Sequence, residues 1–210
     1  MSNPLLLIDT DVFLFLAASG LLHDAIALLG FDLPRARRLE PLDKQLRRGR
    51  SFLQYPEAFR RIALDEARTI APLRDYPNES AAVQELALVE AIHPGEAFLF
   101  AVLAENPGHL LATGDKTSLI ALATAPNLRS IRDSLAGRIA CLETVVLGLL
   151  RTKGAPEIAA ALTPLRSLNV VLQVVLSLGI HTPGPQMEQY LGHYIRDLEE
   201  QVGTDFLFKP

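Results

Sequence analysis

Leu5-Leu6-Leu7-Ile8-Asp9-Thr10-Asp11, residues 5–11, is the stretch that decides the fold class of this 210-residue chain. It begins with four aliphatic residues in a row, which is typical of a strand buried on both faces of a parallel sheet. Residues 12–29 then show helical spacing and stop at Gly30, a residue favoured just after a helix. A buried strand followed at once by a helix predicts a βα unit, and with it an α/β fold around a parallel sheet.

Two later apolar runs continue this pattern. Residues 109–113 and 138–142 each predict a buried strand, and the first run leads into Thr113-Gly114-Asp115. Helical spacing and turn residues predict helices at 42–49, 56–70, 81–91, 96–106, 117–124, 143–152, 156–178 with a break near Pro164, and 185–202. We therefore expect one α/β domain over residues 1–145, with a helical C-terminal extension over 146–210 that packs on the same domain.

Acidic residues stand where the predicted strands end. Asp9 and Asp115 follow two of the strands, and Glu96 begins the helix that runs back along the sheet before the second. Parallel strands present their carboxyl ends at one edge, where open α/β sheets bind ligands, so the topology brings the three carboxylates together. Like charges in one cleft repel each other unless a proton or a cation neutralises them. Hard oxygen ligands suit Mg²⁺ or Mn²⁺, and such a site suits phosphodiester hydrolysis.

Simpler structural roles are open to the same residues. Asp9 or Asp11 can cap the helix that follows the first strand. Glu96 can be a favourable charge in a first helical turn, and Asp115 can be a turn residue. Each acid alone is therefore ambiguous, and the prediction of a site depends on all three lying at one end of the sheet.

Basic residues concentrate in one segment, although the whole chain carries a net charge of −4. Nine of the twenty lysines and arginines lie between Arg35 and Arg61. A local excess of this kind can bind phosphates on an acidic protein, and it is equally typical of a solvated helical face. Over residues 35–61 we therefore expect a basic helical segment that either holds a nucleic-acid backbone or faces solvent.

Cys141 is the one cysteine of the chain, which excludes an internal disulfide framework and a cysteine-rich zinc site. The apolar start of the chain lacks a preceding basic region, and Asp9 and Asp11 interrupt it, unlike a secretory signal peptide. The longest later apolar stretch, residues 168–180, is too short to span a bilayer comfortably. These features predict a cytoplasmic protein with no membrane partner.

Three motifs, in this order along the chain, resemble those of PIN-domain nucleases. Leu6-Leu7-Ile8-Asp9-Thr10-Asp11-Val12 is similar to the family's opening strand, and Gly95-Glu96-Ala97 is similar to the Gly-Glu helix of one branch. Leu110-Leu111-Ala112-Thr113-Gly114-Asp115-Lys116 is similar to its fourth-strand motif. The resemblance covers about residues 5–145. It implies a three-layer α/β/α PIN-like fold and a divalent-metal-dependent endoribonuclease that uses Mg²⁺ or Mn²⁺.

The resemblance also implies roles for individual residues. Carried over by position, Asp9, Glu96 and Asp115 are the catalytic residues and the metal ligands. Thr113 then helps to orient the site, and Asp11 lies beside the first acid. RNA is the implied substrate.

The sequence departs from the family pattern at one position. PIN domains carry another acid in a Glu-Leu-Arg-like context, and the best match here places Gln45 there. Asp43 and Glu40 are the nearby acids that could replace it. The candidate contacts to the RNA backbone are the arginines that follow, Arg47, Arg48 and Arg50.

Other functions stay open. A neutral amide such as that of Gln45 binds a metal more weakly than a carboxylate, which leaves the alternative of a catalytically weakened PIN-like module that binds RNA or protein. A haloacid-dehalogenase-like phosphatase would use Asp9 as nucleophile, Asp11 as general acid and Asp115 as a metal-binding acid. The helices after residue 145 are candidates for a protein-partner surface or a homo-oligomer interface.

Overall fold

The structure is a computed structural model that describes residues 3–40, 42, 55–74 and 80–209 of the chain. The helix predicted at 42–49 lies outside these ranges except for its first residue. The same holds for five candidate site residues, whose roles stay predictions: Asp43, Gln45, Arg47, Arg48 and Arg50.

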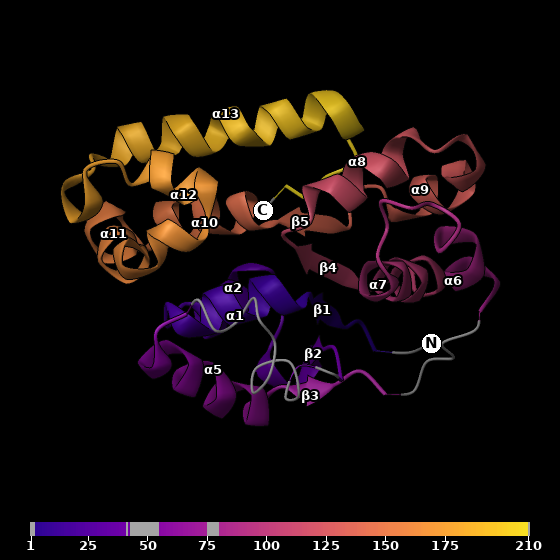
Figure 1. Ribbon diagram of the computed structural model, residues 1–210, viewed down its shortest axis with the longest axis horizontal. Coiled ribbons are helices and arrows are strands. Elements are labelled where there is room, and N and C mark those ends of the chain that lie inside the picture. Colours follow the sequence, from indigo (N-terminus) through magenta and orange to yellow (C-terminus); the bar gives the residue numbers. More distant parts are fainter. Residues whose placement is uncertain (1–2, 41, 43–54, 75–79, 210) are drawn as a thin grey trace.

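A five-stranded parallel sheet forms the centre of the molecule (Figure 1). Its strands are β1 (Leu6–Ile8), β2 (Ala36–Arg38), β3 (Ala71–Pro72), β4 (Leu110–Thr113) and β5 (Ile139–Cys141). They lie in the order β3-β2-β1-β4-β5, and each neighbouring pair is parallel. The α/β class and the parallel sheet predicted from the sequence are confirmed. The chain leaves β1 toward β2 and β3 and returns on the other side at β4, so the strand order reverses between β1 and β4.

Helices connect the strands and continue after the last one. The α-helices are α1 (Thr10–Ala18), α2 (Leu22–Leu28), α5 (Glu57–Thr69), α6 (Ala81–Leu86), α7 (Pro94–Glu105), α8 (Lys116–Thr124), α9 (Arg129–Leu135), α10 (Leu142–Lys153), α11 (Ala155–Leu162), α12 (Val170–Val175) and α13 (Gly184–Val202). Short 3₁₀ turns are η1 (Leu33–Arg35), η2 (Pro126–Leu128), η3 (Thr163–Leu168) and η4 (Gly179–His181). Over the described ranges, none of these helices by itself has both the length and the apolar composition needed to cross a membrane.

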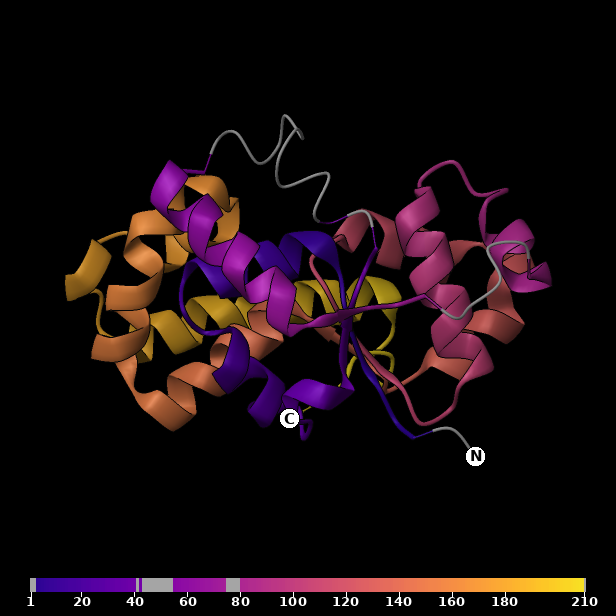
Figure 2. The ribbon, with the colours of Figure 1, turned by 90° about the horizontal axis from the view of Figure 1, so that it is seen from below.

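Helices cover both faces of the sheet, because successive side chains of a strand point to opposite sides. Leu6 and Ile8 of β1 pack into one hydrophobic core with side chains of α1, α2, α5, α10, α11 and α12. Leu7 packs into a second core with side chains of α6, α7, α8 and α9. Figure 2 shows these two groups of helices on opposite sides of the strands. The last helix, α13, joins both cores, through Met187 in the first and Leu198 in the second.

The single helix predicted over residues 12–29 is wrong, because the chain forms two helices, α1 and α2, bent by 118° relative to each other. Gly20 ends α1 with a positive φ of 73°. Its backbone N–H donates to the carbonyl of Ala17, and the N–H of Leu21 donates to the carbonyl of Leu16. This pair of hydrogen bonds is a Schellman motif, in which a glycine in left-handed conformation ends a helix.

The basic segment predicted as helical at 35–61 begins instead with the strand β2. Arg38, at the end of β2, is only 5% exposed. Its Nε donates to the carbonyls of Ala67 and Ile70 at 3.0 and 3.1 Å, and its Nη1 donates to the carbonyl of Leu39. Arg38 thus satisfies carbonyls at the C-terminal end of α5, which a helix leaves without partners of its own. The expectation of a phosphate-binding or solvated role is wrong for this arginine.

Three further elements differ from the prediction. The strand β3 and the helix α9 form where no element was expected, and the helix expected at 81–91 ends earlier, as α6. β2 and β3 are short and carry arginines or a proline, so they lack the apolar run that marks a buried strand. Their pairing with β1 and with each other places them in the sheet.

Shortening a side chain at the centre of β1 should greatly destabilise the folded protein. Leu7 is fully buried between strands and helices, and we expect Leu7→Ala to lower the free energy of unfolding by about 2–5 kcal/mol, from lost apolar burial and the cavity left behind. Leu88→Ala is the matched control, because Leu88 is 81% exposed. Urea unfolding of both variants measures the difference. Equal stabilities for the two variants would contradict the packing described here.

Candidate functional site

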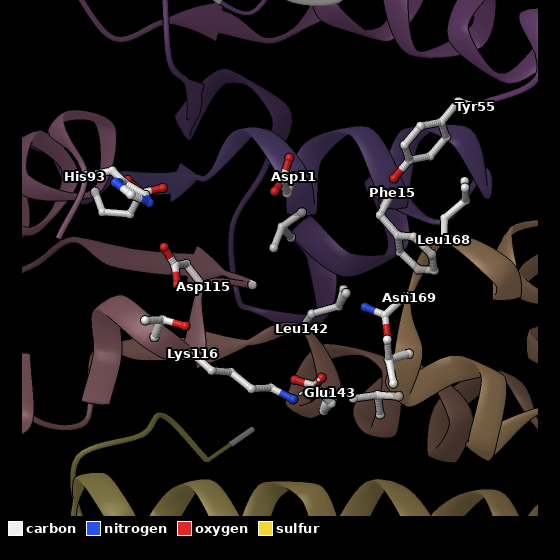
Figure 3. Close-up of a pocket in the computed structure, with 16 residues that line it drawn as sticks. Asp11, Phe15, Tyr55, His93, Asp115, Lys116, Leu142, Glu143, Leu168 and Asn169 are labelled. Atoms are coloured by element: carbon white, nitrogen blue, oxygen red, sulfur yellow. Dashed lines mark ion pairs between the residues drawn. The ribbon is translucent and has the colours of Figure 1, made fainter. Parts of the chain in front are cut away.

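A pocket of about 600 Å³ opens at the carboxyl edge of the sheet. The helices α1, α8 and α10 each begin just after a strand ends, and α7 runs back toward the start of β4, so their N-termini all reach this edge. The point where the strand order reverses, between β1 and β4, lies at the same edge, which is where open α/β sheets bind ligands. Figure 3 shows the side chains that line the pocket, including those of Asp11, Asp115 and Glu143.

Thr113 links the acids at the ends of β1 and β4. Asp9 is 4% exposed, and its Oδ1 accepts the backbone N–H of Thr10 at 2.6 Å, which makes Asp9 the N-cap of α1. The Thr113 hydroxyl donates to the other oxygen, Oδ2, at 3.4 Å. Its Oγ1 also accepts the backbone N–H of Asp115 at 3.2 Å. One hydroxyl therefore contacts the Asp9 carboxylate and the backbone of Asp115.

Asp115 is the N-cap of α8. Its Oδ1 accepts the backbone N–H of Ser118 at 3.0 Å, and its Oδ2 accepts the Ser118 hydroxyl at 2.7 Å. The capping role considered from the sequence is thus present for Asp9, whereas Asp115, considered there as a turn residue, is also a helix cap. A carboxylate oxygen has two lone pairs, so the capping bonds leave the oxygens of Asp115, which lines the pocket, able to accept a second contact. Asp9 is buried and is not among the described residues that line the pocket.

The acids at this edge raise one another's pKa values. Burial, followed by the carboxylates of Glu96 and Asp11, raises the pKa of Asp9 to about 7, and Asp115 adds to the rise. Burial and then the charge of Asp115 raise the pKa of Asp11. Burial raises the pKa of Glu96 as well, with Asp115 and Asp11 contributing. The predicted acids therefore lie close enough to repel one another. Their hydrogen bonds do not offset the whole of this repulsion and of the cost of burial.

The side chains do not form a ready-made metal cage in this structure. Among the residues that the structure describes, no group of three histidine, cysteine, aspartate or glutamate side chains is arranged to hold a metal ion. The donor set nevertheless has the right chemistry, since it consists of hard carboxylate oxygens, and burial together with neighbouring carboxylates raises the pKa values of Asp9 and Glu96. A divalent cation would neutralise that charge.

Glu143 is a residue of the pocket that the sequence analysis missed. It is the second residue of α10, directly after β5, and is 4% exposed. Its Oε1 lies 2.7 Å from Nζ of Lys116, while its Oε2 is buried and has no hydrogen-bond partner among the described residues. The same signal that marked Asp9, an acid just past an apolar strand, also marks Glu143. It was overlooked because Glu143 was assigned only to the start of a helix.

An apolar wall closes the other side of the pocket. Phe15 of α1, Leu142 of α10, Leu168 of η3 and Val171 of α12 line it. The last two come from the C-terminal helices, for which the sequence analysis predicted no part in the site. Asn169 lies between them and caps α12 by accepting the N–H of Leu172.

The raised pKa of Asp9 predicts that the stability of the metal-free protein depends on pH. Its carboxyl has a pKa of about 7 in the folded protein against 3.8 ordinarily. Between these values the folded state holds a proton that the unfolded chain has released, so this contribution is full below about pH 4 and is lost as pH rises through about 7. The loss is on the order of 4 kcal/mol. We expect Asp9→Asn to remove this slope, measured by urea unfolding in EDTA across that range.

Asp205→Asn is the control for this pH dependence, because Asp205 is exposed and lies away from the acids. It should keep the slope of the wild-type protein. The same slope in Asp9→Asn and in wild type would show that Asp9 does not titrate as its burial requires.

The Lys116–Glu143 pair predicts a second effect on stability. The Glu143 side chain is 5% exposed and that of Lys116 is 30% exposed. Lys116→Met leaves a buried carboxylate without its counter-charge, so we expect it to lower the free energy of unfolding by about 3 kcal/mol. The double variant Lys116→Met/Glu143→Gln removes both charges and should cost less than half as much. A double variant less stable than the single one contradicts this account of the pair.

No family model, curated protein or solved structure matches the chain.

Proposed function

We propose that this chain is a PIN-like, divalent-metal-dependent endoribonuclease with a three-layer α/β/α core and a helical C-terminal extension. Asp9, Glu96 and Asp115 are the proposed ligands of Mg²⁺ or Mn²⁺. The observation that supports the proposal most is the shared electrostatic field of these carboxylates at the edge where the strand order reverses. The resemblance of the three sequence motifs supplies the reaction.

These carboxylates need a bound cation to take part in phosphodiester hydrolysis. A bound divalent cation would lower the pKa of a water ligand and stabilise charge on a phosphoryl oxygen. The Thr113 hydroxyl would hold the Asp9 carboxylate. The same hydroxyl accepts the backbone N–H of Asp115, just after β4, and so ties the two acids together. Asp11 is exposed and lines the pocket beside these acids, so it is placed to exchange a proton near the reacting group.

The substitution Asp115→Asn separates the metal role from the capping role. Asparagine is as good an N-cap as aspartate, so α8 keeps its first turn, whereas the carboxylate charge is lost. We expect wild type to cleave a single-stranded RNA in the presence of Mn²⁺. In Asp115→Asn the rate should fall by more than the roughly 10- to 100-fold that loss of an outer-shell group costs a metal site. Cleavage of a fluorophore–quencher RNA measures both rates.

Two controls accompany the cleavage assay. Asp205→Asn should cleave RNA at the wild-type rate, because this carboxylate is exposed and remote from the acids. EDTA should abolish cleavage by all three proteins. Equal cleavage by wild type and Asp115→Asn, or cleavage that survives EDTA, would refute the proposed metal-dependent site.

The remaining outcomes distinguish the alternatives. RNA binding with no Mn²⁺-dependent cleavage would support a catalytically weakened module. A phosphoaspartate trapped at Asp9 would support the phosphatase alternative. That alternative requires Asp9 itself to be accessible to a phosphoryl group, and Asp9 is 4% exposed, whereas a cation in the pocket can also be held by Glu96 and Asp115, which line it.

A further inference from the structure

We propose that Lys116 forms a phosphoryl-binding subsite in the pocket and that the apolar wall beside it holds the base of the same nucleotide. The pocket would thus take one nucleotide unit, with Glu143 and Tyr194 keeping the lysine in place. This inference deepens the proposed ribonuclease by naming the unit it binds. It concerns binding without a metal, so it can be tested separately from cleavage.

Charge is the first observation behind the subsite. Among the described residues that line the pocket, Lys116 is the only lysine or arginine, and His93 is the other basic residue. Asp11, Glu96, Asp115 and Glu143 also line the pocket, and their charges disfavour an anion. Lysine is a compact positive charge that binds phosphate in many proteins. Lys116 is therefore the side chain of this lining to which a phosphate can bind without a metal.

The lysine is held in position by groups from three elements. Lys116 is the first residue of α8, its Nζ lies 2.7 Å from Glu143 Oε1 of α10, and the same atom lies 5.3 Å from the ring centre of Tyr194 on α13. Figure 3 shows the Lys116 side chain extended along the pocket to the Glu143 carboxylate. An ammonium has three N–H donors, so the bond to Glu143 leaves donors for a ligand. Fixing the side chain beforehand lowers the entropy cost of binding.

Glu143 contributes an unfilled acceptor beside the lysine. Its Oε2 is buried and has no partner among the described residues. In Figure 3 this second oxygen points away from Lys116, on the side of Asn169. A buried carboxylate oxygen without a donor is costly, so Glu143 is held at this edge chiefly by its pairing with Lys116. Glu143 therefore positions the lysine and does not itself contact the ligand.

The wall of the pocket suits the flat, largely apolar face of a base. Phe15, Leu142, Leu168 and Val171 present apolar side chains there, and Asn169 adds an amide whose Nδ2 can donate. The volume of about 600 Å³ lies within the range of small-ligand sites. An apolar wall beside a fixed ammonium matches the base and the phosphate of a single nucleotide.

Binding of adenosine 5′-monophosphate tests the subsite. The full-length protein is titrated in EDTA with this nucleotide and, in parallel, with adenosine, and heats of binding give the two dissociation constants. We expect the nucleotide to bind more tightly than the nucleoside. Loss of one charge-assisted hydrogen bond corresponds to about ten- to hundredfold in affinity. Lys116→Met/Glu143→Gln should weaken nucleotide binding by that factor and leave adenosine binding unchanged.

The double variant is used because it avoids an unpaired buried carboxylate, and near-ultraviolet circular dichroism verifies that it is folded. Lys153→Met is the matched control, since Lys153 pairs with Asp24 and Glu157 outside the pocket, and it should bind the nucleotide as wild type does. Leu168→Asp should weaken binding of both nucleotide and nucleoside, because it places a charge in the wall.

Three results would overturn the subsite. They are no binding of the nucleotide by wild type, equal affinities for nucleotide and nucleoside, and a double variant that binds the nucleotide as wild type does. Asp115→Asn distinguishes this inference from the proposed function. If that variant and wild type both bind the nucleotide while neither cleaves RNA, the subsite stands and the ribonuclease proposal fails.

Discussion

The pairing of β1 with β4 is the contact on which the rest of the molecule depends. Leu6 lies beside Leu110 and Ile8 beside Ala112, and the N–H of Asp9 continues the ladder by donating to the Ala112 carbonyl at 2.9 Å. This register sets the Asp9 carboxylate beside the Thr113 hydroxyl. A slip of one residue would turn the alternate side chains of β1 to the wrong faces and separate the two strand ends. Core packing and the site therefore depend on the same register.

The carboxyl edge balances buried charge in two different ways. At the end of β5, the carboxylate of Glu143 receives an ammonium from the chain itself, Lys116. At the end of β1, Asp9 accepts only a backbone N–H and a hydroxyl, and burial together with the charges of Glu96 and Asp11 raises its pKa to about 7. The charge of Glu143 is thus balanced by a side chain of the protein, whereas the charge of Asp9 would have to be balanced by a proton or an external cation. Because the ends of β5 and β1 differ in charge balance, a charged ligand can bind at this edge in one preferred orientation.

The parts of the structure that sequence predicts are those with a local signal. Aliphatic runs marked β1, β4 and β5, and the acids after β1 and β4 followed from parallel topology. β2 was missed because Arg38 is a charged residue in a strand, and its partners are carbonyls of α5 that only the tertiary structure brings near. Leu168 and Val171 carry no mark of a pocket wall in the sequence, since they meet the acids only through packing of the C-terminal helices. The helix break at Gly20 has a local signal, because glycine is favoured just after the end of a helix.

The pocket wall has a consequence for how the protein is made. Synthesis proceeds from the N-terminus, so Asp9, Glu96 and Asp115 leave the ribosome before Leu168 and Val171 have emerged. The strands that carry the acids belong to an earlier part of the chain than the side chains that enclose them. An enclosed pocket is therefore a late product of translation.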